Sequence, residues 1–112
     1  MENIVGRIRS EVTSWDGVSV HPHRFGGIEF RLEGKPIGHL HGERWADLLF
    51  PRRIRDMLVE TGRAEPHHVL PESGWVSKQI RDERDAAEAV ELFRLAWERA
   101  RVARAVREAQ SG

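Results

Sequence analysis

Histidine is the residue type that points most directly to chemistry in this chain. The six histidines of the 112 residues fall into three close pairs, which are His21/His23, His39/His41 and His67/His68. Two of the pairs have i, i+2 spacing within segments that alternate apolar and polar residues, so each pair projects from one face of a strand. Imidazole titrates near neutral pH and is a common metal ligand. The spacing therefore predicts a site for proton transfer or for metal binding.

Three interpretations of these histidines are open from the residues alone. The two His-x-His pairs and Glu29 could hold zinc, copper, nickel or iron, although no HExxH spacing accompanies them. Alternatively, neutral imidazoles could act as general bases that take a proton from an acidic phenol or enol. In the third interpretation they are half-exposed strand residues that bond to Glu29 and to the backbone.

The register of one hairpin decides where the histidines point. A three-residue loop at 33–35 places Leu40 opposite Ile28 and His39 opposite Glu29, whereas a two-residue loop at 33–34 places His39 opposite Ile28. We favour the three-residue loop, because it buries Leu40 and keeps the imidazoles out of the core. On that register His21, His23, His39 and His41 share the sheet face that lies away from the core helices.

The elements that position the histidines follow from hydrophobic periodicity. Apolar spacings of three and four predict a helix over 2–14, and Pro51 and Gly62 bound a second helix over 51–61. Alternation predicts strands, and Pro22 puts the first of them at a sheet edge or at its own end. The alternation of the first strand covers 18–23, the other expected strands cover 28–32, 36–41, 45–50 and 75–80, and a loop covers 65–74. The order predicts an α+β fold with a mainly antiparallel sheet of about four to five strands.

A long C-terminal helix closes the pattern. Asp82 is its expected N-cap, and its buried stripe consists of Ala86, Val90, Phe93, Trp97 and Ala100. The stripe weakens beyond Ala100, where arginines alternate with alanine and valine. We therefore predict one domain over 1–100 and a projecting helical tail over 101–112, whose last turns fray.

Composition excludes several classes of protein. No apolar run exceeds three residues, so no membrane span is expected. The absence of cysteine excludes disulfides and thiolate sites and fits a cytoplasmic protein. Eighteen Lys and Arg balance eighteen Asp and Glu, so no general affinity for nucleic acid is expected. A small-molecule ligand is the expected partner, and a homo-oligomer is left open.

Several ordered motifs resemble those of the luciferase-domain family, which comprises small bacterial proteins and the domain of fungal luciferases. The likeness extends over about residues 15–100, and its motifs are HPHRFGG at 21–27, Glu29-Phe30, GHLHG at 38–42, Asp47, FPRR at 50–53 and PHHVLPESGWV at 66–76. The last motif, with the strand and helix after it, is also similar to the MmcQ/YjbR-like α+β fold. This likeness is the weaker of the two.

The resemblance implies a function that the residues alone do not. Fungal luciferases oxidise a hydroxylated pyrone with molecular oxygen and without a metal or organic cofactor. By resemblance, this chain is expected to oxygenate a small electron-rich enolic or phenolic molecule with no cofactor and no metal. The site residues implied are catalytic His39, His41 and His68, with substrate-binding His23, Arg24, Glu29, His67 and Trp75. The alternative is a non-catalytic module that binds a small molecule or a protein.

Overall fold

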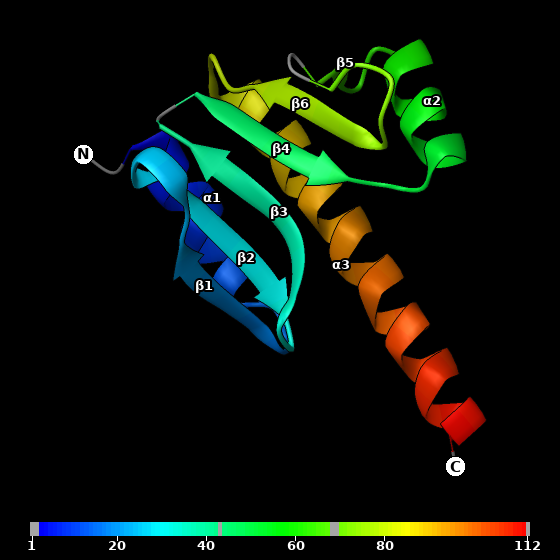
Figure 1. Ribbon diagram of the computed structural model, residues 1–112. Coiled ribbons are helices and arrows are strands. Elements are labelled where there is room, and N and C mark those ends of the chain that lie inside the picture. The colour runs from blue at the N-terminus through cyan, green and yellow to red at the C-terminus, as the bar shows by residue number, and fades with distance from the viewer. Residues whose placement is uncertain (1–2, 43, 68–69, 112) are drawn as a thin grey trace.

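One antiparallel sheet and three helices make up the computed structural model, which describes residues 3–42, 44–67 and 70–111 (Figure 1). The sheet order is β1-β2-β3-β4-β6-β5. The strands are β1 (Val18–Pro22), β2 (Ile28–Leu32), β3 (Lys35–His41), β4 (Trp45–Leu49), β5 (Glu65–Pro66) and β6 (Trp75–Gln79). The helices are α1 (Ile4–Thr13), α2 (Arg52–Glu60) and α3 (Glu83–Ser111), and a short 3-10 turn, η1, spans Arg24–Gly26. The predicted α+β class is confirmed.

The hydrophobic core lies between the sheet and the two helices α1 and α3, which pack against each other behind it (Figure 1). Strand residues such as Phe30, Leu40 and Leu48 alternate toward this side and are buried. Phe93 of α3 meets Phe30 edge to face, with ring centres 5.2 Å apart. Because α1 and α3 cover this face, the histidines of the strands lie on the other face of the sheet, away from the core.

Local chemistry sets the helix ends close to their predicted places. The side chain of Asn3 caps α1, and Asp82 caps α3 by accepting a hydrogen bond from the backbone N–H of Asp85 at 2.8 Å. The first helix is shorter than the predicted 2–14, and the second, predicted over 51–61, is one residue shorter at each end. Gly62 ends it with a φ of 75°, as its position predicts.

The hairpin of β2 and β3 combines features of the two registers considered above. Its loop has two residues, Glu33 and Gly34, so the predicted three-residue loop is wrong. Leu40 nevertheless lies opposite Ile28, and His39 opposite Glu29, because the register shifts between Phe30 and Arg31. A β-bulge supplies the extra residue that the longer loop was expected to supply. The predicted face of the histidines is therefore correct for a different reason.

One further segment differs from expectation, and the C-terminal tail projects as a helix, as predicted. The predicted loop 65–74 contains the two-residue strand β5, which pairs with β6. The C-terminal tail stays helical as far as Ser111 and extends past the sheet (Figure 1). An ion pair at 2.5 Å joins Arg104 of this tail to Glu33 of the hairpin turn. Among the described residues, no helix is both long and apolar enough to cross a membrane.

Candidate functional site: a histidine-lined hollow

A row of polar residues crosses the sheet on the face opposite α1 and α3. The residues lie directly opposite one another on successive strands, in the order His21, Glu29, His39, Asp47, Ser77. Directly opposed residues of paired strands project from the same face. His41 follows His39 by two positions and joins them on that face. The row therefore brings two carboxylates and several imidazoles together.

Glu29 and His39 form the first carboxylate–imidazole pair. The Nε2 atom of His39 lies 2.8 Å from Oε1 of Glu29, and the two side chains are only 12% and 9% exposed. The other carboxylate oxygen of Glu29 accepts a hydrogen bond from Nε of Arg31 at 2.5 Å. A neutral His39 must carry its proton on Nε2 to donate to Glu29, which leaves Nδ1 with a free lone pair.

The surroundings of this pair lower the pKa of both side chains. Burial lowers the pKa of His39, because it disfavours the protonated imidazole. The hydrogen bond to Glu29 raises this pKa, whereas the neighbouring His23 and His41 lower it further. Burial by itself raises the pKa of Glu29, but the hydrogen bonds with Arg31 and His39 outweigh it and leave that pKa below its usual value. Glu29 is therefore ionised and His39 neutral around pH 7.

Asp47 and His41 form the second pair. Oδ2 of the buried Asp47 carboxylate lies 2.8 Å from Nε2 of His41, and 3.7 Å from Nε2 of His67. Its Oδ1 accepts a hydrogen bond from the hydroxyl of Ser77 at 2.6 Å. His41 is more open than His39, with 34% of its side chain exposed. The two pairs come from adjacent strands and lie side by side.

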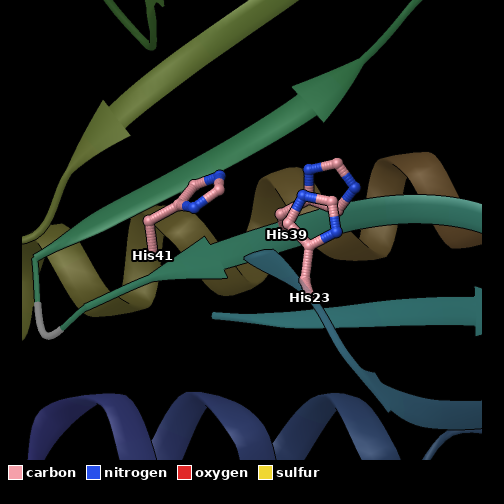
Figure 2. A group of neighbouring side chains, drawn as sticks. All are labelled: His23, His39 and His41. Atoms are coloured by element: carbon pink, nitrogen blue, oxygen red, sulfur yellow. The ribbon is translucent and has the colours of Figure 1, made fainter. Parts of the chain in front are cut away.

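Stacked aromatic rings hold His39 in place. Its ring centre lies 3.9 Å from that of His23 and 5.2 Å from that of Trp75, with interplanar angles of 19° and 25°. His41 meets His23 and His39 edge-on, at 5.5 and 5.7 Å. Figure 2 shows the three imidazoles together, with the rings of His23 and His39 overlapping. His39 is thus fixed both by its carboxylate and by its ring neighbours.

These side chains surround an open hollow of about 220 Å³. Its lining consists of His23, Arg24, His39, His41, Asp47, His67, Leu70 and Trp75. Imidazole and indole rings offer flat faces for a planar molecule, and Arg24 offers a positive charge. The volume fits a small molecule rather than a large cofactor.

The same imidazoles raise the question of a metal ion. One ligand atom from each of His23, His39 and His41 lies within 4.8 Å of the others. A metal must lie in the plane of each ring that binds it, about 2 Å from the nitrogen. The nearly parallel rings of His23 and His39 cannot both meet this condition, so these two imidazoles would have to separate first. The three histidines do not form a ready-made metal centre.

The structure brings most of the predicted site residues together. Of the eight, His23, Arg24, His39, His41, His67 and Trp75 line the hollow, and Glu29 holds His39. His68 lies outside the described residues. His21 shares the face, as predicted, but its Nε2 lies 2.8 Å from the hydroxyl of Ser19.

The predicted site residues did not include Asp47, Ser77 and Leu70, although Asp47 was named among the motifs of the family. Asp47 could have been chosen as a site residue from its type, because it is a charged residue in the middle of an apolar strand, where an unpaired charge is costly. Leu70 belongs to a segment without periodicity. No signal in that segment predicts that it would face the hollow.

Comparison with known proteins identifies the class of protein. The family model described as "Luciferase domain" matches residues 34–96, more than half of the chain. The chain belongs to the luciferase-domain family, as its motifs indicate. The match includes both histidines of β3, Asp47 and Trp75, whereas Glu29 and His23 lie before it. Searches of curated proteins and of solved structures found no match.

Proposed function

We propose that this protein oxygenates a small enolic or phenolic molecule in the histidine-lined hollow, without a metal or organic cofactor. The observation that carries the proposal is the Glu29–His39 pair, whose 2.8 Å contact and burial prepare one imidazole nitrogen to accept a proton. Family membership agrees with this chemistry but does not specify a substrate. We propose the cytoplasm as its compartment, because the chain has no cysteine.

The reaction begins with transfer of the acidic proton of the substrate to Nδ1 of His39. The resulting enolate or phenolate gives one electron to molecular oxygen, which yields a substrate radical and superoxide. Combination of the two forms a carbon–oxygen bond and a peroxide anion. Glu29 stabilises the imidazolium that forms on His39, and Trp75 and Arg24 are suited to hold the ring and the negative charge of the substrate.

Oxygen consumption with a panel of hydroxypyrones and phenols tests this function. We expect uptake with at least one enolic compound, and a loss of at least about 100-fold for His39→Gln, because general base catalysis contributes roughly that factor or more. His21→Asn is the matched control, since His21 shares the face and bonds to Ser19 instead.

The pattern of results separates enzyme from binding module. Saturable binding of the same compounds without oxygen uptake would support the alternative function, a non-catalytic module for a small molecule. Equal losses in His39→Gln and His21→Asn would contradict the role given to His39.

A further inference from the structure

The helical side of the molecule, opposite the hollow, carries a second open surface. A groove of about 410 Å³ lies between α1 and the first turns of α3. Its lining contains four apolar and four charged residues, which are Ile8, Ala86, Ala87, Val90, Arg7, Glu11, Glu83 and Glu91. Three of the four charged side chains are carboxylates, and Arg7 is already paired with Glu83. The groove is therefore both apolar and acidic.

The other end of α3 has the complementary character. Residues 101–111 extend past the sheet (Figure 1), and they contain three arginines but only one glutamate. Val102 and Val106 of this tail are 64% and 49% exposed. They lie one turn apart and therefore on one side of the helix. The tail thus offers an apolar side and a net positive charge, whereas the groove offers an apolar lining and a net negative charge.

One exposed face of α3 connects the groove with the tail. Its residues follow one another at helical spacings of three, four and seven, and all of them are exposed: Ala87, Glu91, Glu98, Val102, Ala105 and Ala109. The first two line the groove, and the last three belong to the tail. Because groove and tail lie at opposite ends of this face, a second α3 running antiparallel would bring each tail to the other groove.

We infer that this face of α3 is a contact between two copies of the chain, in which the tail of each copy lies along the groove of the other. The antiparallel alignment that puts Ala87 opposite Ala105 brings two small side chains together. The same alignment puts Val90 of the groove opposite Val102 of the tail. The exposed apolar side of the tail is then covered.

The charges support the same alignment. It places Glu91 opposite Arg101 of the other copy, and Arg94 opposite Glu98 of the other copy. In a closed dimer with two-fold symmetry each of these contacts is made twice. Specific interfaces bury roughly 1,200–2,000 Å² in total. A single tail of about three turns is too short to supply this area, so we expect a reversible dimer in which both tails are engaged.

Sedimentation velocity of the full chain over a range of protein concentrations tests the inference. We expect a concentration-dependent shift from one chain to two. Val106→Glu in the tail and Ala87→Lys in the groove should each weaken the association at least about tenfold, because the contact would then bury an unpaired charge. Met57→Glu and Met57→Lys are the matched controls, since Met57 is an exposed apolar residue of α2, and both should associate like the wild type.

A mixture of the two interface variants distinguishes tail-to-groove contact from contact between two tails. Equimolar Val106→Glu and Ala87→Lys chains should associate again, because one contact keeps its native residues and the other joins the new lysine to the new glutamate. A single chain at every concentration would overturn the inference. So would association that Ala87→Lys leaves unchanged, or a mixture that does not recover. The hollow takes no part in this contact, so either outcome leaves the proposed function as it stands.

Discussion

Gly38 of β3 lies directly against Phe93 of α3. A Cβ atom built on Gly38 would lie 2.6 Å from Cε1 of the Phe93 ring, and 3.1 Å from the backbone oxygen of Asp47. The glycine lets the helix approach the strand between His39 and the bulge. The packing of the core thus reaches the strand that carries two histidines of the hollow.

Gly38→Ala is expected to destabilise the protein by about 1–3 kcal/mol, the usual cost of overpacking a core. Urea unfolding measures the loss. The double variant Gly38→Ala/Phe93→Leu should lose less than the sum of its single variants, because the smaller side chain makes room for the methyl group. Simple additivity would show that the contact with Phe93 is not the cause.

Trp97→Ala should be among the most destabilising single changes, at about 3–5 kcal/mol. The indole is 8% exposed, packs against Trp15 with ring centres 5.5 Å apart, and donates a hydrogen bond to the backbone oxygen of Asp16 at 3.0 Å. Truncation therefore leaves a cavity and an unpaired carbonyl. Thermal or urea unfolding gives the value, and a loss below about 1 kcal/mol would contradict this account.

His39→Ala should cost about 1–3 kcal/mol, because it removes one partner of the buried Glu29 carboxylate. His21→Ala, on the same face, should cost less than about 0.5 kcal/mol, since its contact with Ser19 is exposed. Comparison of the two variants by urea unfolding separates the paired histidine from the merely adjacent one. Equal losses would mean that the Glu29 contact contributes nothing to stability.

The buried carboxylate of Asp85 should make the free energy of unfolding depend on pH in the acidic range. The hydrogen bond from Arg81 holds the pKa of Asp85 below its ordinary value despite burial, and Lys78 lies 3.6 Å away. Because the pKa of Asp85 is lower in the folded than in the unfolded protein, its ionised carboxylate stabilises the fold at pH values above the unfolded pKa of about 3.9. This contribution is lost as the pH falls through the folded pKa.

Asp85→Asn should therefore be less stable than wild type at pH 7, and the difference should shrink as the pH falls below about 4. Urea unfolding at several pH values provides the measurement. Glu91→Gln serves as a control for loss of an exposed carboxylate on the same helix. A difference that is independent of pH would exclude Asp85 as the source.

The purified protein should contain no stoichiometric zinc, copper, nickel or iron. The reason is the stack of His23 on His39, in which the two rings cannot meet one ion without separating. Elemental analysis of the protein, prepared without chelator and without an affinity tag, gives the answer. About one ion per chain, lost in His39→Ala, would reverse this expectation and favour the metal interpretation.

Much of the fold could be predicted because it depends on local signals. Alternation placed the strands, and Asp82 and Gly62 marked helix ends. The hairpin shows where such reasoning stops. A turn of two residues and a bulge produce the same register as a turn of three. The requirement that Leu40 be buried and His39 face away from the core therefore predicts the register but not the length of the turn.

The site was predictable to the extent that residue type alone suggests chemistry. Histidines are conspicuous, and four of the six expected residues that line the hollow are histidines, whereas Arg24 and Trp75 were expected only from the family resemblance. The contacts of Asp47 depend on which strands become neighbours, and β6 joins β4 from thirty residues away, as the Ser77 contact shows. Strand order is a property of the whole sheet, which no local pattern encodes.

The polar row across the sheet makes the hollow a non-local feature of the chain. His23 follows β1, Glu29 belongs to β2, and Trp75 begins β6 at the other side of the sheet, so no short fragment contains the site. A ligand held there would contact residues from both ends of this row, next to β1 and on β6. Because it would bind only the complete fold, it would stabilise the folded protein as a whole. A chain divided at the turn of Glu33 and Gly34 would recover binding only when its two pieces reassociate, which makes ligand binding a direct reporter of correct assembly.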